Sequence, residues 1–138
     1  MIGVDVFNIL SDRKAVSDIV GRNIFPNDAS ARETPMPCLI YELQNLSMDS
    51  TYDQEGTIDL AEIDLVVHCI AKTYRDVQAL YAAVMLALVD YKGGRIDGMK
   101  HDSSSEDSFF NPNTDEIQYY KVDVTFKVWF NWRQQEIA

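Results

Sequence analysis

Hydrophobic and polar residues alternate most clearly over residues 117–130. The even-numbered positions from Tyr120 to Phe130 are apolar, whereas the odd-numbered positions mix lysine, aspartate and threonine with aromatic residues. A period of two places the two sets on opposite faces of a strand. At the usual rise, fourteen residues extend roughly 46 Å, which exceeds the length of an ordinary strand. The segment therefore predicts a long strand with one buried face.

Two earlier apolar runs, 38–45 and 58–71, also predict strands. Pro35 and Pro37 precede the first run, and proline pushes the residue before it toward extended geometry. In the second run, apolar residues alternate with Glu62, Asp64 and His68. Two apolar residues just before Ala61 are out of phase with this alternation. They predict a β-bulge near that position.

The spacing of apolar residues over 4–20 predicts a helix in two pieces. A patch around Phe7 and Leu10 is followed by Val16, Ile19 and Val20 at i, i+3 and i+4. Side-chain oxygens of Ser11 or Asp12 can accept from the free N–H groups at the start of the second piece. Gly21 predicts its end.

A second helix is predicted over 73–91, where apolar residues recur at alternating intervals of three and four. Its later part, 79–89, is apolar all round, which is typical of a helix covered on more than one side. Another subunit is one source of such cover. Gly93 and Gly94 predict the end of the helix.

The remaining segments predict connections. Residues 21–37 contain three prolines and no period, and indicate an irregular loop. The polar, acidic segment 45–57 predicts a long loop or a protruding hairpin. Residues 95–100 predict a short strand or turn, and 101–108 an acidic, solvated turn. This order predicts a single domain over 1–138 of the α+β class, mainly an antiparallel sheet with two principal helices packed on one face.

Composition narrows the class of protein. With 138 residues and 46% hydrophobic residues, the chain is long enough to bury a core without metal or disulfide support. The N-terminus lacks the pattern of a signal peptide, and the longest apolar run is too short to cross a membrane. We therefore expect a soluble cytosolic protein with no membrane partner. A formal net charge of −10 disfavours specific nucleic-acid binding, because phosphate groups are repelled.

Candidate chemistry is sparse, and we expect no catalytic, cofactor-binding or metal-binding residues. His68 and His101 are not spaced as metal ligands, and His68 is expected to be structural. The acids between Asp49 and Asp59 lack the spacing of a calcium loop. Ser103 to Ser105 have no base placed nearby by the local sequence.

The cysteines and the lysines of the last strand have structural interpretations. Cys38 and Cys69 lie in apolar runs and are expected to be buried thiols, with a disulfide or a reactive cysteine as the alternative. Lys121 and Lys127 are expected to meet acidic residues of a neighbouring strand, Glu62 and Asp64. A base-stacking platform is the weaker reading of the aromatic and basic residues in this last strand.

Five segments occur in an order that resembles the tail terminator, or tail completion, proteins of long-tailed bacteriophages and prophages. The more telling ones are a Gly-x-x-Ile-x-Pro turn (Gly21, Ile24, Pro26) before a proline-led strand, and a strand that runs straight into a Thr-Tyr helix start. In chain order, the segments are "DIVGRNIFPNDA", "TPMPCLIYEL", "AEIDLVVHCIAKTYRDVQAL", "KGGRIDG" and "YYKVDVTFKVWF". Together they span almost the whole chain.

The resemblance implies a structural protein that is not an enzyme. It implies a subunit of a ring, usually a hexamer, that caps the tail tube at its head-proximal end. The implied partners are further copies of the chain, the tail tube protein and the head-connector or stopper protein, with DNA passing through the hole without specific binding. The implied location is the tail or neck of the virion, after assembly in the host cytoplasm.

Two sets of residues become candidates for this role. Acidic residues could line the hole or contact neighbouring proteins, although they also fit plain solvated loops: Asp49, Asp53, Glu55, Glu106 and Asp107. Leu86, Tyr119 and Trp129 could contact the next subunit, although they also fit an ordinary core. Another neck or tail protein (an adaptor, a stopper or a tube subunit) is the main alternative function, and a small acidic binding module or enzyme is a further one.

Overall fold

The structure is a computed structural model of the chain. It describes residues 2–26, 35–53, 56–110, 112–114 and 116–131, and for 48–53 and 56–59 it describes the backbone alone. The secondary-structure elements, in chain order, are α1 (Ile2–Asp12), α2 (Lys14–Val20), β1 (Ile24–Pro26), β2 (Cys38–Asp53), β3 (Gly56–Ala71), α3 (Tyr74–Leu88), β4 (Ile96–Phe110) and β5 (Ile117–Asn131).

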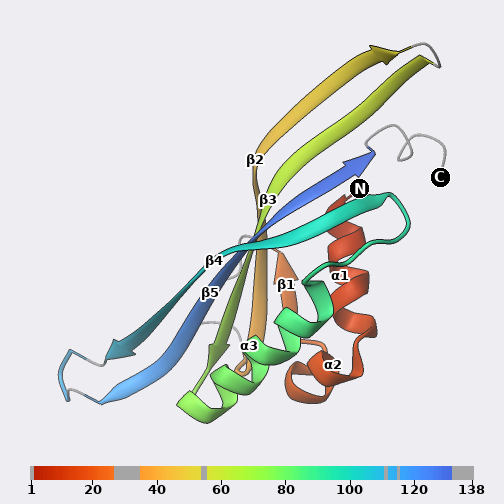
Figure 1. Ribbon diagram of the computed structural model, residues 1–138. Coiled ribbons are helices and arrows are strands. Elements are labelled where there is room, and N and C mark those ends of the chain that lie inside the picture. The colour runs from red at the N-terminus through yellow and green to blue at the C-terminus, as the bar shows by residue number, and fades with distance from the viewer. Residues whose placement is uncertain (1, 27–34, 54–55, 111, 115, 132–138) are drawn as a thin grey trace.

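The strands form one five-stranded sheet in the order β1-β2-β3-β5-β4. Neighbouring strands are antiparallel, except that the short β1 runs parallel to the start of β2. The three helices lie on one face of this sheet (Figure 1). The predicted α+β class and the mainly antiparallel sheet are therefore confirmed. The three-residue strand β1 lies within the segment that was predicted to be irregular.

The core lies between the helices and the inner face of the sheet, which is the face toward them. Alternate residues of β3 and β5 point into it, as the period of two predicts. Phe126 and Leu65 are fully buried there, as are Leu10 of α1 and Leu80 of α3. A smaller cluster lies on the outer face, the face without helices, around Cys38, Ile40 and Ile70. The inner-face core holds these elements together, because burying apolar surface is the main favourable term in folding.

The helix boundaries partly confirm the prediction. The N-terminal helix is indeed in two pieces, and Gly21 ends the second with a positive φ of 59°. The residue that precedes α2 is Arg13, without a side-chain cap, so the predicted cap by Ser11 or Asp12 is wrong. α3 begins behind Thr73, whose hydroxyl accepts from the Asp76 N–H at 3.1 Å. This cap satisfies one of the free donors of the first turn.

β2 and β3 form a long hairpin, which decides between the two predictions for 45–57. Strand pairing continues from Cys38 and Ile70 to Asp53 and Gly56, well past the predicted strand ends. The sheet has a bulge near the predicted place, but on β2. Register shifts between Gln44 and Ser47, where Asn45 has a φ of 56°. Two residues on β2 there face one on β3, which bends the hairpin.

The largest difference between the structure and the sequence-based prediction concerns β4. Residues 95–100 and 101–108 were predicted to be a short strand and an acidic turn, yet Ile96–Phe110 is one strand paired with β5 along its length. Ile96 and Met99 are buried, and every residue from Lys100 to Phe110 is exposed. A strand that is exposed to solvent on both faces has no alternation of apolar and polar residues. Hydrophobic periodicity therefore gives no signal for it.

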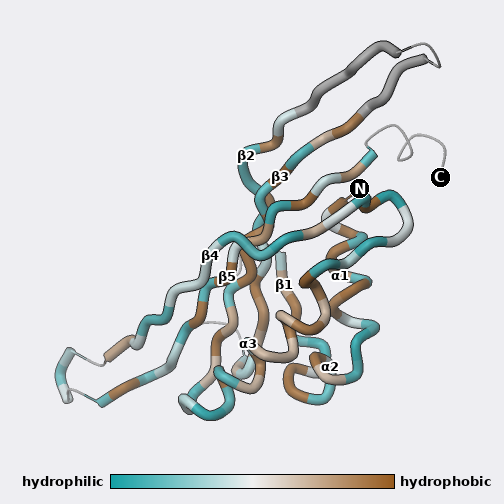
Figure 2. Tube along the Cα trace, viewed as in Figure 1, coloured by the Kyte–Doolittle hydropathy of each residue, from teal (hydrophilic) through white to brown (hydrophobic). Residues whose placement is uncertain are grey.

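The two hairpins extend from the sheet in opposite directions, beyond the area that the helices cover (Figure 1). We call residues 50–59 the β2–β3 arm, because this part of β3 pairs with β2 and lies beyond its pairing with β5. We call residues 107–121 the β4–β5 arm. The hydropathy of the chain differs between the regions: apolar segments gather under the helices, and polar segments occupy much of β4 beyond Met99 (Figure 2).

Candidate functional site

The acidic candidate residues lie in two separate places. Asp49 and Asp53 belong to the part of β2 whose backbone alone is described, and Glu55 lies outside the described residues. Glu106 and Asp107 are exposed on β4, toward the opposite end of the molecule (Figure 1). The fold of one subunit therefore does not bring the two acidic groups together.

The three candidate interface residues are also dispersed. Leu86 lies on α3 with 79% of its surface exposed, the largest value among the exposed large hydrophobic side chains of the described residues. Tyr119 and Trp129 lie on the outer face of β5 and are half-buried. Tyr119 packs against the outer-face cluster and stacks on Phe109, with ring centroids 4.6 Å apart. Leu86 is therefore the candidate interface residue with the least packing inside its own subunit.

The β4–β5 arm carries an apolar tip that the sequence reading missed. Phe109, Phe110 and Ile117 are all exposed, and Phe110 keeps 56% of its surface open. Figure 2 shows hydrophobic segments on both strands near the end of this hairpin. The signal in the sequence was the adjacent pair Phe109–Phe110 beside a turn-forming "NPNT" segment. Exposed large apolar side chains that gather in one place are typical of an interaction surface.

Contacts with α3 hold the base of this arm. Gln78 donates to Glu106 at 2.8 Å, and the hydroxyls of Tyr81 and Ser104 are 3.0 Å apart. Tyr74 packs edge-on against Tyr120, with centroids 5.7 Å apart. Links from one helix to both strands fix the direction in which the arm leaves the core, so its tip is presented in a defined place.

His101 also lies where the β4–β5 arm joins the core. Its position differs from the expectation that no basic side chain lies beside Ser103 to Ser105. Its Nε2 lies 2.7 Å from the Ser104 hydroxyl, and its ring packs edge-on against Phe126. The imidazole of His101 therefore does lie beside the Ser104 hydroxyl. Neither residue lines the cleft beside α1, the one between α3 and the β4–β5 arm, or the one beside Trp129. The pair stands on an exposed strand and joins β4 to α3 through Tyr81.

The outer face of the sheet is covered by an ionic network. His68 Nδ1 hydrogen-bonds to Asp123, and its Nε2 is 3.6 Å from a Glu42 oxygen. Lys121 lies 3.5 Å from Asp123. Burial acts to raise the pKa of Asp123, but the hydrogen bond and charge of His68, with Lys121, outweigh it and lower that pKa. His68 is thus a structural histidine with polar partners, as predicted.

Lys127 completes this network and confirms one of the two predicted lysine contacts. Its ammonium is 3.3 Å from a Glu62 oxygen and 3.4 Å from an Asp64 oxygen. Hydrogen bonds and charge from Glu62 and Asp64 raise the pKa of Lys127. Lys121 instead meets Asp123 of its own strand. Both outer-face lysines are therefore held by acidic neighbours, and this network contains more acidic side chains than lysines.

Two features bear on binding chemistry. In the described part of the chain, no three His, Cys, Asp or Glu side chains gather as metal ligands. Cys38 and Cys69 are both buried and not joined in a disulfide. They lie on opposite faces of the sheet, and burial strongly raises the pKa of the Cys69 thiol. A thiol with a raised pKa is a poor nucleophile, which agrees with the structural reading.

A cleft of about 520 Å³ lies between α1 and the turn after α3. Arg95 and Asp5 form an ion pair inside it, with Nε and Oδ2 2.8 Å apart, while Arg95 Nη1 is buried without a hydrogen bond. Acidic and basic residues balance along the cleft, with Asp12 and Arg13 also in its wall. This pair ties α1 to the start of β4.

Charge is divided between the sheet and the helical layer. Residues 38–71, which form β2 and β3, contain seven acidic residues and no lysine or arginine. Residues 96–131, which form β4 and β5, contain seven acidic and three basic residues. Residues 72–95, including α3, contain four basic and two acidic residues. The negative charge of the chain is therefore a property of the strands and of both arms.

Comparisons with known proteins agree with this architecture. The chain matches the family described as "Tail completion protein gp17" over residues 4–131. A solved structure described as "Virion of native gene transfer agent (GTA) particle" contains a chain with the same fold. The TM-score is 0.60 at 18% sequence identity, over 91% of this chain and 90% of that one. No curated protein matches the sequence.

The family is one of structural virion proteins without enzymatic activity, which confirms the non-enzymatic prediction. It accounts for a subunit with exposed arms and no cleft of converging acid–base groups among its described residues. No helix within the described ranges is long and apolar enough to span a bilayer. The chain belongs to the tail completion protein gp17 family, and it is a phage tail completion protein, a structural component of the virion tail.

Proposed function

We propose that six copies of this chain close into a ring at the head-proximal end of the tail tube. The ring caps the tube, joins it to the head connector or stopper, and leaves a hole through which DNA passes. The observation that carries this proposal is the pair of arms. They leave the core in opposite directions (Figure 1), and the β4–β5 arm keeps Phe110 and Ile117 exposed by 56% and 42%.

Ring closure requires heterologous contacts, in which one patch of a subunit meets a different patch of the next. The exposed Leu86 on α3 and the apolar tip of the β4–β5 arm are two such patches on different parts of the subunit. Leu86, Phe110 and Ile117 remain exposed on the described part of the subunit. This supply of unlike, uncovered patches supports a closed cyclic assembly.

The division of charge supports a passage for DNA. The strands of the sheet carry the acidic excess, and the outer face has no helices over it. We assign this outer face, with the β2–β3 arm, its Asp53 and Glu55 and the adjoining Asp49, to the wall and rim of the hole. A wall of the same sign as the phosphate backbone keeps DNA from adhering. Lys121 and Lys127 are held by acidic neighbours, so they offer little free positive charge.

The test is a phage that lacks this chain. We expect tails of irregular length that fail to join heads, and we expect purified chain added to the lysate to restore joining. Electron microscopy of the particles measures both. Tails of normal length, already attached to heads, would contradict the capping and joining function. Absence of any tube would instead favour a tube subunit, the main alternative.

A further inference from the structure

β4 is the last strand of the sheet, so one of its sides has no neighbouring strand among the described residues. Its pairing with β5 shifts register at His101/Ser103 and again at Phe109/Phe110, and it is regular between these two places. Every residue of this regular stretch is exposed. We call the free side of Ser103–Phe109 the open edge.

A hydrogen bond at the other rim of the sheet shows which backbone groups of the open edge point outward. The Leu39 N–H donates to the Asn23 carbonyl at 2.9 Å, on the side of β2 away from β3. In an antiparallel sheet, two paired residues either bond to each other or both point away, and the choice alternates along each strand. Leu39 pairs with Cys69, Cys69 with Val122, and Val122 with Glu106. The N–H and C=O of Glu106 therefore point outward.

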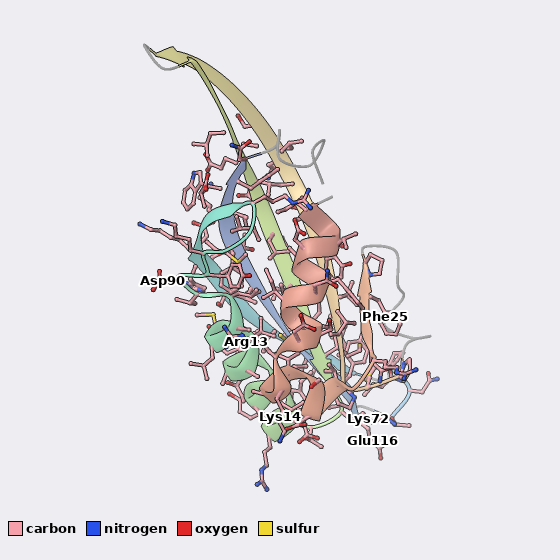
Figure 3. The ribbon with its side chains drawn as sticks, turned by 90° about the vertical axis from the view of Figure 1, so that its right-hand side faces the viewer. Arg13, Lys14, Phe25, Lys72, Asp90 and Glu116 are labelled. Atoms are coloured by element: carbon pink, nitrogen blue, oxygen red, sulfur yellow. The ribbon has the colours of Figure 1, made fainter. Side chains whose placement is uncertain are left out.

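A second hydrogen bond gives the same phase and marks where the open side of β4 begins. The Asp90 N–H donates to the Met99 carbonyl at 2.9 Å, on the side of β4 away from β5. Figure 3 shows Asp90 beyond the upper end of α3, where this bond closes the start of the strand. Farther along, the residues of the open edge whose N–H and C=O point outward are Ser104, Glu106 and Ser108.

The surroundings of the open edge are acidic. Residues 101–124 contain six acidic residues and one lysine, and that lysine, Lys121, lies 3.5 Å from Asp123. Residues 72–76 at the start of α3 add two basic residues and one acidic residue, so the excess stays negative. Charge on an edge strand is a common protection against pairing with further copies of the same chain. In a chain of net charge −10, this protection disfavours a second copy and leaves the edge to a basic segment.

A cleft of about 210 Å³ lies between α3 and the open edge. Glu106 and Asp107 line it together with Tyr74 and Tyr120, whose rings pack edge-on. Glu106 accepts from Gln78 at 2.8 Å, so its side chain is on the face of the sheet toward α3. Every second side chain of an added strand lies on this same face. Carboxylates beside aromatic rings suit a lysine or arginine side chain.

We propose that the open edge accepts an extended, basic segment of a neighbouring virion protein as a further strand of the sheet, with one basic side chain in this cleft. The inference rests on the proposed joining function, because a joint needs a surface for a protein other than the chain itself. Backbone hydrogen bonds supply affinity, and the acidic side chains select basic over acidic segments. The links of Gln78 and Tyr81 to β4 hold the edge in place before binding, which lowers the entropy lost on docking.

Hydrogen exchange in the purified full chain tests the strand addition at single amides. The probe is a short synthetic peptide with lysine at every second position between valine and threonine residues. We expect slower exchange at the amides of Ser104, Glu106 and Ser108, whereas those of Ser105 and Asp107, which point toward β5, change little. The control is the same peptide with glutamate in place of lysine, which should protect none of them.

Three results of this measurement would overturn the proposal. The first is the absence of protection at the outward amides. The second is equal protection by the basic and the acidic peptide, because the edge would then not select by charge. The third is protection that grows with the concentration of the chain alone, because a second copy would then cover the edge.

Ser108→Pro separates backbone pairing from charge. Proline removes the outward N–H of this residue, keeps the bonds to β5 and leaves every carboxylate in place. We expect about tenfold weaker binding of the basic peptide, whereas Ser108→Ala, the matched control, should bind like the unaltered chain. Melting temperatures close to that of the unaltered chain check folding. Unweakened binding by a folded Ser108→Pro variant would show attraction by charge alone and would overturn strand addition.

The same variant in the virion separates this inference from the proposed function. Electron microscopy is expected to show Ser108→Pro rings that form but lose their contact with the tube or the head. Normal joining by a variant that no longer binds the peptide would overturn the inference and leave the ring standing. If the unaltered chain forms no ring at the tail end, the proposed function itself fails, and hydrogen exchange still reports on the open edge by itself.

Discussion

The β4–β5 hairpin contains two regions of similar strand geometry and opposite environment. Near the core, Ile96 and Met99 of β4 and Phe126 and Phe130 of β5 are buried under the helices. In the arm, Phe109, Phe110 and Ile117 are exposed, although backbone pairing continues up to the partners Phe110 and Ile117.

The difference shows that pairing and burial serve separate purposes in this chain. The covered region stabilises the subunit, because its aromatic and aliphatic side chains leave water on folding. The arm gains its order from backbone pairing and from its anchored base, so its apolar side chains remain available to a partner. Substitutions in the two regions should therefore affect different properties, and four comparisons test this separation.

The largest effect on stability is expected in the covered region. Phe126→Ala removes a fully buried ring and leaves a cavity beside Leu65 and the inner face. We expect it to lower the free energy of unfolding by about 3–5 kcal/mol. Phe110→Ala in the arm is the matched control, expected to cost less than about 0.5 kcal/mol. Chemical denaturation measures both; equal losses would show that the arm is part of the core.

Leu86→Asp should leave folding intact and abolish assembly. The side chain is 79% exposed, so the subunit loses little packing, whereas an interface would have to bury an unpaired charge. The measurements are the melting temperature and incorporation into tails. Leu86→Met, which keeps an apolar side chain of similar volume, is expected to assemble. Normal incorporation of the Asp variant would remove Leu86 from any interface.

The outer-face network should give a moderate effect that depends on pH. The pKa of Asp123 is lowered, so the carboxylate stabilises the fold above its unfolded pKa of about 4, and this contribution is lost as pH falls through the lower folded value. Asp123→Asn is expected to cost about 1 kcal/mol at pH 7, with the difference from the unaltered chain shrinking below about pH 4. Denaturation series at both pH values measure this, and a constant difference would contradict it.

The smallest effect is expected for Asp49→Asn combined with Asp53→Asn in the hairpin of β2 and β3. Folding should be unchanged, because these residues lie far from the helical layer along the hairpin. Head joining or DNA passage should fall a few-fold, since the rim of the hole loses negative charge. Infectivity is the readout, and Ser50→Ala is a neutral control. Full infectivity would exclude this pair from function.

The covered region was readable from the sequence, and the arms were not. The alternation from Tyr120 to Phe130 and the helix at 73–91 leave a periodic signal, because one side of each element is buried. The strand at Cys38 is buried on both faces at its start, and its apolar run behind two prolines indicates it instead. β4 beyond Met99 leaves none, because water reaches both of its faces. The error at 101–108 follows from that physical difference.

The candidate site residues also differ in whether the sequence could reveal them. Leu86 was identified as a candidate because a helix apolar all round suggests a second covering partner. The contact of His101 with Ser104 joins neighbours three residues apart on a strand that periodicity did not reveal. The link between Gln78 and Glu106 spans separate elements and depends on tertiary packing. Neither contact leaves a mark in local sequence.

The central claim is that uncovered surfaces of this subunit exist to build a closed ring at the end of the tail. End-on electron-microscopy averages of the head-proximal end of isolated tails, with this chain labelled, test it most directly. The account predicts a single closed ring of six labelled subunits around an open hole. Label distributed along the tube, or a single copy at the tail end, would contradict it.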